Sequence, residues 1–128
     1  MLRPKHIFIV DDDPIVTKLI SKRLSNEGYN ISAFAFAEEC IAALPDNPDL
    51  IILDLYFLKE GISKMDGMEA FKRIQAYNPD LPVIILSGQE KGELVLELAR
   101  KGISGYVIKD HSLIDNLFKS IAEIFNLQ

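Results

Sequence analysis

The chain has 128 residues, of which 48% are hydrophobic and 26% charged, the composition of one globular domain with a single buried core. Its formal net charge of −5 argues against a broad nucleic-acid-binding face, which would need a basic surface. One cysteine, Cys40, excludes an intramolecular disulfide and a multi-cysteine metal site. No apolar run approaches the roughly 20 residues of a membrane span, and the N-terminus lacks a signal-peptide core. We therefore expect a single domain over residues 1–128, located in the cytoplasm.

Segments with strand patterns alternate along the chain with segments of helical periodicity. The expected strands are 6–12, Tyr29–Ala35, Leu50–Leu55, Leu81–Leu86 and Gly105–Lys109. The expected helices run from Pro14 to Gly28, Ala37 to Leu44, Asp66 to Asn78, Glu90 to Lys101 and Ser112 to Phe125. Asp13 before Pro14 is typical of a helix N-cap, and Gly28 and Pro45 are typical helix stops.

Strict alternation of strands and helices predicts a parallel sheet that is covered by helices on both faces. The chain is too short for an eight-fold barrel, which needs roughly 250 residues. An open, doubly wound α/β fold remains. We expect a five-stranded parallel sheet in the flavodoxin-like order 2-1-3-4-5.

The run Leu50–Leu53 is apolar enough for a strand buried on both faces, and it ends in Asp54. A carboxylate there is costly unless it is used, and ligand sites of open α/β sheets lie just beyond such strand ends. In the expected topology other polar residues gather at the same edge, namely Asp11, Asp12, Ser87 and Lys109. Asp54 is therefore the candidate reactive group.

Three carboxylates at one edge repel one another unless a cation lies among them. Oxygen ligands without histidine or cysteine suit Mg²⁺, or alternatively Mn²⁺. Ser87 can donate a hydrogen bond, and the ammonium group of Lys109 is suited to a phosphoryl oxygen. A carboxylate nucleophile, a divalent ion, a hydroxyl and an ammonium group together favour phosphoryl transfer onto an aspartate.

Five motifs in this order resemble a receiver domain of response regulators in two-component signalling: 8–14, Leu50–Leu55, Met65–Gly67, Val83–Gly88 and Gly105–Lys109. The resemblance implies that Asp54 accepts the phosphoryl group and that Asp11 and Asp12 form an acidic pair. Asp12 and Asp54 would bind Mg²⁺ by carboxylate, with Asp11 acting through water. The backbone carbonyl of Tyr56 would be a further ligand. Ser87 and Lys109 would contact the phosphoryl group, and Tyr106 would be the aromatic switch residue.

Two segments depart from the usual family pattern. The stretch Tyr56–Lys64 is about five residues longer than usual and lacks a Met-Pro pair. Asp110 follows Lys109, where many members carry a cis proline. Other notable residues have simple structural interpretations: we interpret Asp13 and Asp66 as helix caps and Cys40 as a packing residue.

The expected fourth helix buries an apolar arc of Leu94, Val95, Leu98 and Ala99, and Leu96 falls opposite it. Phe118 and Phe125 flank the apolar arc of the last helix. These residues indicate a partner surface made by helix 4, strand 5 and helix 5.

The resemblance implies a signalling switch that receives its phosphoryl group from a sensor histidine kinase or a histidine phosphotransfer protein. The switch would be no enzyme beyond assisting its own phosphorylation and dephosphorylation, and it would act on a homodimer partner or an effector. Neither direct nucleic-acid binding nor membrane contact is expected. One alternative is an aspartyl-phosphate phosphatase, although Tyr56 stands where such enzymes carry a second aspartate. Others are a flavodoxin-like cofactor binder, disfavoured by the aspartates after the first strand, and a degenerate receiver used only for interactions.

Overall fold

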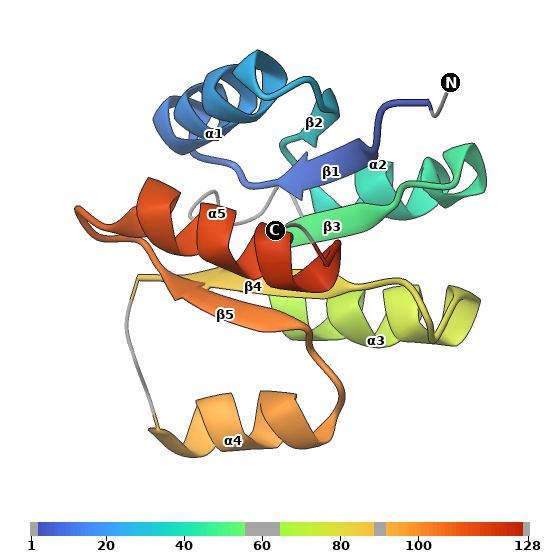
Figure 1. Ribbon diagram of the computed structural model, residues 1–128. Coiled ribbons are helices and arrows are strands. Elements are labelled where there is room, and N and C mark those ends of the chain that lie inside the picture. Colours follow the sequence, from blue (N-terminus) through green and yellow to red (C-terminus); the bar gives the residue numbers. More distant parts are fainter. Residues whose placement is uncertain (1–2, 56–64, 89–91, 127–128) are drawn as a thin grey trace.

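A computed structural model describes residues 3–55, 65–88 and 92–126. Within these ranges the strands are β1 (His6–Val10), β2 (Asn30–Phe34), β3 (Leu50–Asp54), β4 (Val83–Ser87) and β5 (Gly105–Ile108). The helices are α1 (Pro14–Asn26), α2 (Ala37–Ala42), the short 3₁₀ helix η1 (Leu44–Asp46), α3 (Gly67–Tyr77), α4 (Gly92–Arg100) and α5 (Leu113–Ile124). Strands and helices alternate as the sequence predicts (Figure 1).

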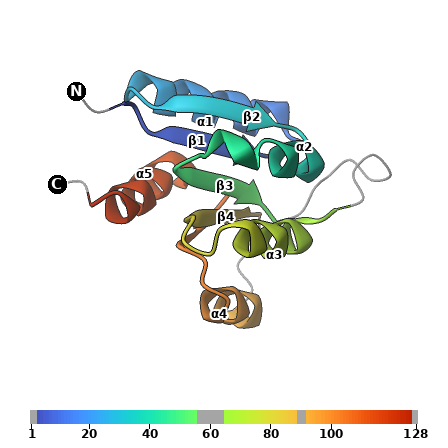
Figure 2. The same cartoon turned by 90° about the vertical axis from the view of Figure 1, so that its right-hand side faces the viewer.

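The strands form one parallel sheet in the order β2-β1-β3-β4-β5, so the predicted doubly wound, flavodoxin-like fold is confirmed. Helices α1 and α5 cover one face, and α2, α3 and α4 cover the other (Figures 1 and 2). Side chains alternate between these faces along each strand, as the two-residue repeat of a strand requires. On β1, for example, Ile9 packs on the α1 side and Val10 on the α3 side.

Two apolar clusters hold the helices on the sheet. The cluster below α1 and α5 includes Ile7, Ile9, Ile20, Leu24, Ile52, Leu117 and Ile121. The cluster below α2, α3 and α4 includes Phe8, Val10, Cys40, Leu53, Phe71, Ile74 and Leu98. The central strand β3 is buried along its whole length and contributes to both clusters, as its continuous apolar sequence predicts.

The structure confirms most of the predicted helix caps and helix ends. The Asp13 carboxylate accepts a hydrogen bond from the Ile15 amide at 2.9 Å, and the Asp66 carboxylate accepts one from the Glu69 amide at 2.9 Å. Gly28 follows α1 with φ of +90°, a conformation that favours glycine. The second helix is shorter than predicted: α2 ends at Ala42, and Pro45 lies inside η1 instead of terminating α2. Proline is accepted there because it occupies the first turn, where its missing N–H costs no hydrogen bond.

Helix α4 is the least embedded helix of the described chain, with Leu98 as its one buried residue. Ala99, predicted to be buried, is exposed, because the packed stripe of α4 is narrower than the predicted arc. Leu96 is 58% exposed, which confirms its predicted outward position. No described peptide bond is cis, so Lys109 and Asp110 are joined by a trans bond. None of the described helices has the length and apolar character to cross a bilayer.

Candidate phosphoryl-acceptor site

The register of the sheet brings the predicted carboxylates together. Val10 of β1 pairs with Leu53 of β3, so Asp11 and Asp54 are the next residues along two neighbouring strands. Asp12 follows Asp11 in the turn that leads into α1. One carboxylate oxygen from each aspartate lies within 4.8 Å of those of the other two. The strand order expected from the sequence predicted that Asp11, Asp12 and Asp54 lie close together, and the structure confirms this.

All three aspartates are buried: Asp11 is 2% exposed, Asp12 4% and Asp54 2%. Buried carboxylates of like charge destabilise a fold unless cations or hydrogen bonds compensate them. The ammonium nitrogen of Lys109 supplies part of that compensation, 2.7 Å from Asp11 Oδ2 and 3.1 Å from Asp54 Oδ1. Lys109 follows β5 directly, and its amide donates to the Ser87 carbonyl at 2.8 Å, which fixes its backbone beside β4.

Burial and the contacts of Lys109 determine the direction of the pKa shifts of Asp11 and Lys109. Burial raises the pKa of the Asp11 carboxyl above its ordinary value, although hydrogen bonds from Lys109 and from the Asp13 amide counteract this effect. Burial alone would lower the pKa of the Lys109 ammonium group, but its contacts with Asp11 and Asp54 outweigh burial and raise it. Lys109 therefore stays charged between the carboxylates of Asp11 and Asp54.

The site fits a hard divalent cation. Its donors are carboxylate oxygens, and no histidine or cysteine belongs to the group of candidate ligands among the described residues. The spacing of the three oxygens allows them to share one ion, and buried acids in excess over lysine favour a further positive charge. Of the other predicted site residues, Ser87 is 1% exposed at the end of β4, and Tyr106 is half-buried on β5. Tyr56 lies outside the described residues.

Two supporting residues were not predicted from the sequence. Gly67 begins α3 so close to β3 that a Cβ atom on it would lie 2.5 Å from the carbonyl oxygens of Asp54 and Leu55. Its amide also donates to the Leu55 carbonyl at 3.1 Å. Thr17 of α1 donates its hydroxyl to the Asp11 carbonyl at 3.2 Å. The helix-start pattern at Met65–Gly67 signalled a turn, but nothing in it signalled contact with the acceptor strand.

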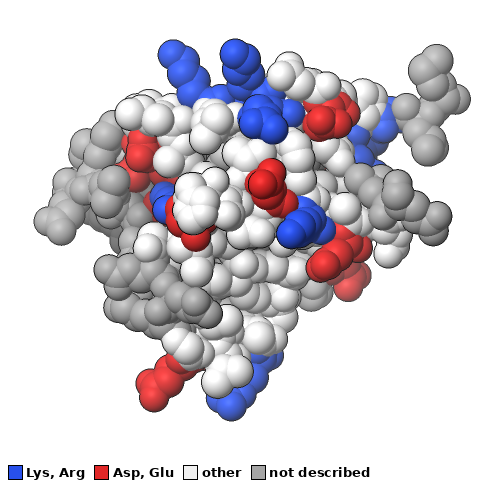
Figure 3. Space-filling model, turned by 60° about the vertical axis from the view of Figure 1, so that its left-hand side comes forward, with Lys and Arg blue, Asp and Glu red and all other residues white. Residues whose placement is uncertain are grey.

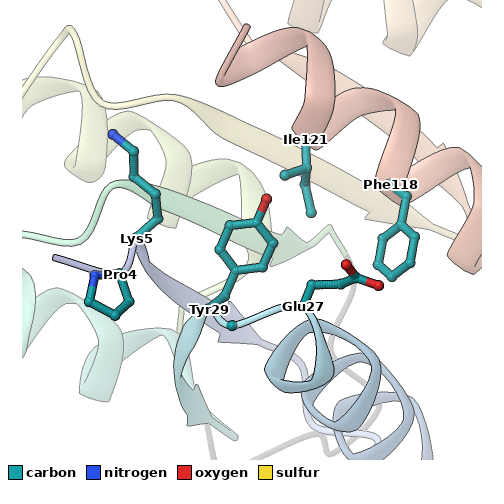
Figure 4. Close-up of a pocket in the computed structure, with 7 residues that line it drawn as sticks. Pro4, Lys5, Glu27, Tyr29, Phe118 and Ile121 are labelled. Carbon is teal, nitrogen blue, oxygen red and sulfur yellow. The ribbon is translucent and has the colours of Figure 1, made fainter. Parts of the chain in front are cut away.

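The structure has a groove beside the carboxylates and a separate pocket at the other end of the strands. A groove of about 390 Å³ starts at Asp11 and Asp12 and runs between α1 and the end of β2, along Pro14, Lys18 and Phe34. A second pocket, of about 490 Å³, lies at the amino ends of the strands (Figure 4). Its lining comes from the segment before β1, the α1–β2 turn and α5, in the order Pro4, Lys5, Glu27, Gly28, Tyr29, Phe118 and Ile121. It shares no residue with the carboxylate site.

The chain is similar to signalling proteins over most of its length. It is 33% identical over 108 residues to the transcriptional regulatory protein GlrR of Escherichia coli, a match that covers 84% of this chain and 23% of GlrR. It is 30% identical over 110 residues to the chemotaxis protein CheY of Treponema pallidum, covering 83% of this chain and 73% of CheY. The chain thus spans about a quarter of the length of GlrR.

Solved structures agree with these sequence relatives. The crystal structure of a CheX–CheY–BeF₃–Mg complex from Borrelia burgdorferi superposes with a TM-score of 0.84 at 25% identity, covering 95% of this chain and 90% of the matched chain. The family model of the response regulator receiver domain matches residues 7–122, which include every described residue of the carboxylate site. The chain therefore belongs to the response regulator receiver domain family.

Proposed function

We propose that residues 1–128 act as one phosphoryl-accepting switch, with Asp54 as the acceptor and Mg²⁺ as the required ion. The single observation that carries this proposal is the position of Asp54. It is a buried carboxylate at the end of the central strand, next to two further buried carboxylates and 3.1 Å from the Lys109 ammonium nitrogen. A related CheY has been crystallised with BeF₃ and magnesium, which supports the same chemistry for this chain.

In the proposed reaction a carboxylate oxygen of Asp54 attacks the phosphorus of a phosphohistidine. The bond from phosphorus to the imidazole nitrogen breaks, and the electron pair returns to the imidazole of the donor. Bound Mg²⁺, held by Asp12 and Asp54 with support from Asp11, would neutralise charge on the phosphoryl oxygens. We expect Lys109 to contact one of these oxygens and Ser87 to donate a hydrogen bond to another. The donor would be a sensor histidine kinase or a histidine phosphotransfer protein.

The proposed output is a change at the surface formed by α4, β5 and α5. Ser87 and Lys109 connect the site with β4 and β5, and Tyr106 lies three residues before Lys109. Near Tyr106 a hollow of about 390 Å³ is bordered by Val95 and Lys119. Leu96 is exposed on α4, whose one buried residue among those described is Leu98. Phosphorylation would shift a two-state equilibrium here and favour a homodimer or an effector.

Mass measurement after incubation with acetyl phosphate tests the acceptor. With Mg²⁺ the wild-type chain should gain the mass of one phosphoryl group, and Asp54→Asn should gain none. Excess EDTA should abolish the gain in the wild-type chain. Labelling of Asp54→Asn, or labelling undiminished by EDTA, would contradict the proposal. Sustained turnover of a small phosphomonoester would instead favour a phosphatase.

NMR spectra with and without beryllofluoride test the output. Wild-type spectra should shift around Asp54 and also at Tyr106 and Leu96, and Leu96→Glu should weaken association without removing the shifts at Asp54. Shifts restricted to the loops around Asp54 would place the output at another surface.

A further inference from the structure

The pocket at the amino ends of the strands takes no part in the proposed phosphoryl transfer. Its volume of about 490 Å³ lies within the range of roughly 300–1,000 Å³ that is usual for small-molecule sites. Three separate segments build it, namely the residues before β1, the turn between α1 and β2, and helix α5 (Figure 4). The pocket shares no residue with the carboxylate site, so phosphoryl transfer does not account for its side chains.

Aromatic rings form walls of this pocket and are held in place by their neighbours. The Tyr29 ring is half-buried, and its centroid lies 6.0 Å from that of Phe125. The guanidinium carbon of Arg23 lies 5.7 Å from the centroid of the Phe118 ring. The sequence grouped Phe118 and Phe125 with helix 4, whereas these contacts place both rings near α1 and the start of β2. Partly exposed rings favour an aromatic ligand, because aromatic rings attract one another in stacked and edge-to-face arrangements.

Two opposite charges border the aromatic walls. Lys5 and Glu27 are both exposed, and Figure 4 shows their side chains on opposite sides of the Tyr29 ring. The Lys5 ammonium nitrogen lies 5.2 Å from the Phe125 ring centroid, a contact that holds this group at the rim without neutralising its charge. Burial raises the pKa of Tyr29, and the nearby Glu27 carboxylate adds to this effect. A positive and a negative group are therefore available at two sides of one ring.

We propose that this pocket binds a small aromatic molecule that carries a carboxylate at one end and an amino group at the other. The ring of the ligand packs against Tyr29 and Phe118. Its carboxylate lies beside Lys5 and its amino group beside Glu27, so the two charges fix its direction. Figure 3 shows acidic and basic side chains on one face of the molecule with uncharged surface between them, so a small ligand is sorted by the charges next to it.

Three small probes test this charge pattern. The compound para-aminomethylbenzoate carries both groups, benzoate lacks the amino group and benzylamine lacks the carboxylate. Each is titrated into the full-length isotope-labelled chain at low salt while amide shifts are followed. We expect para-aminomethylbenzoate to shift amides of residues 27–29 and of α5, with a dissociation constant of about 1 mM. Benzoate and benzylamine should each bind about 3-fold more weakly, because each lacks one exposed ion pair.

Removing one charge of the pocket at a time assigns the two ends of the ligand. Lys5→Gln should weaken binding of para-aminomethylbenzoate and of benzoate about 3-fold without weakening that of benzylamine. Glu27→Gln should have the converse effect, weakening binding of the two amines and not that of benzoate. Tyr29→Leu removes the aromatic wall and should weaken binding of all three probes. Lys72→Gln is the matched control, since Lys72 is an exposed lysine of α3 on the opposite side of the sheet.

Several outcomes would overturn the inference. These are equal affinities for the three probes, no binding of para-aminomethylbenzoate up to about 10 mM, and shifts centred on the carboxylate site or on α4. An equal loss of all three probes in Lys5→Gln would also overturn it, because the lysine would then only support the shape of the pocket. The inference does not rest on the acceptor role, so a failure of acetyl phosphate labelling has no bearing on it.

Discussion

The two ends of the sheet handle charge in opposite ways. At the carboxyl ends of the strands, three aspartates are at most 4% exposed and Lys109 faces two of them. At the amino ends, Arg3 and Asp49 form an ion pair with their side chains 66% and 18% exposed. Asp49 also accepts a hydrogen bond from the His6 amide at 2.8 Å. The Arg3–Asp49 pair is thus partly solvated, whereas among the described residues the carboxyl end gathers three buried carboxylates around Lys109.

This difference separates a structural arrangement from a functional one. A pair such as Arg3 and Asp49 ties the N-terminal segment to the start of β3 and needs nothing further. A buried excess of like charge lowers stability, and it is typical of sites that bind a cation or carry out chemistry. The following predictions test this comparison by changing one charge or contact at a time.

The largest expected effect is that of Lys109→Ala. Removing this ammonium group leaves Asp11 and Asp54 buried without their cation, which should lower the free energy of unfolding by about 3 kcal/mol. Mg²⁺ should recover part of the loss, because the ion replaces the missing positive charge among the carboxylates. Urea denaturation with and without Mg²⁺ measures both effects. Arg3→Ala is the control and should cost less than about 1 kcal/mol, because its pair is exposed. Similar losses in the two variants would contradict the comparison.

The next effect comes from the contact between α3 and the acceptor strand. Gly67→Ala places a methyl group about where Asp54 and Leu55 have backbone atoms, so α3 must shift, at a cost of about 2 kcal/mol. The rate of acetyl phosphate labelling should fall as well, because the displaced contact is with the Asp54 carbonyl. Gly92→Ala is the matched control, since a Cβ there meets nothing within 4 Å. An unchanged melting temperature of Gly67→Ala would show that the α3 contact is unimportant.

The sequence predicted the fold and the convergence of the site for a physical reason. Asp54, Ser87 and Lys109 each occur where an apolar run ends, and parallel topology places such ends at one edge. Contacts made by backbone proximity could not be predicted in this way. In the sequence, Gly67 resembles an ordinary helix start. Its close backbone contact with Leu55 depends on how α3 packs on the sheet.

Boundaries were also less predictable than element types. Pro45 was predicted to terminate a helix, yet it lies in η1, because proline is compatible with the first turn of a new helix. Ala99 follows the apolar periodicity of α4 but is exposed, because this helix packs only a narrow stripe that centres on Leu98. Apolar periodicity in the sequence predicts which side of a helix a side chain lies on. Whether that side chain is buried depends on how closely the helix packs on the sheet.

Two smaller changes in the free energy of unfolding should have opposite signs, one at the carboxyl ends and one at the amino ends of the strands. Asp12→Asn removes one of three buried negative charges while keeping a side chain of similar shape, and it should raise the free energy of unfolding by about 1 kcal/mol without Mg²⁺. Asp49→Ala removes the acceptor of the His6 amide and should lower this free energy by about 1 kcal/mol. Denaturation curves in EDTA measure both. Destabilisation by Asp12→Asn would mean that the carboxylates are fully compensated without a metal ion.

The smallest effect concerns an isolated buried acid, the Cys40 thiol. Burial raises the pKa of this thiol to about 12, because the apolar core below α2 cannot solvate a charged thiolate. An unfolded chain ionises its thiol near pH 8.5, roughly, so the unfolded state gains stability above that pH while the folded thiol stays neutral. The stability difference between the wild-type chain and Cys40→Ala should therefore be constant below pH 8, roughly, and should shrink by about 0.8 kcal/mol on going from pH 7 to pH 9. Denaturation at the two pH values measures this change, and a pH-independent difference would mean that the folded thiol ionises as readily as the unfolded one. Asp11 and Asp54 keep Lys109 beside them, whereas the pKa of Cys40 shows the effect of burial in an apolar core.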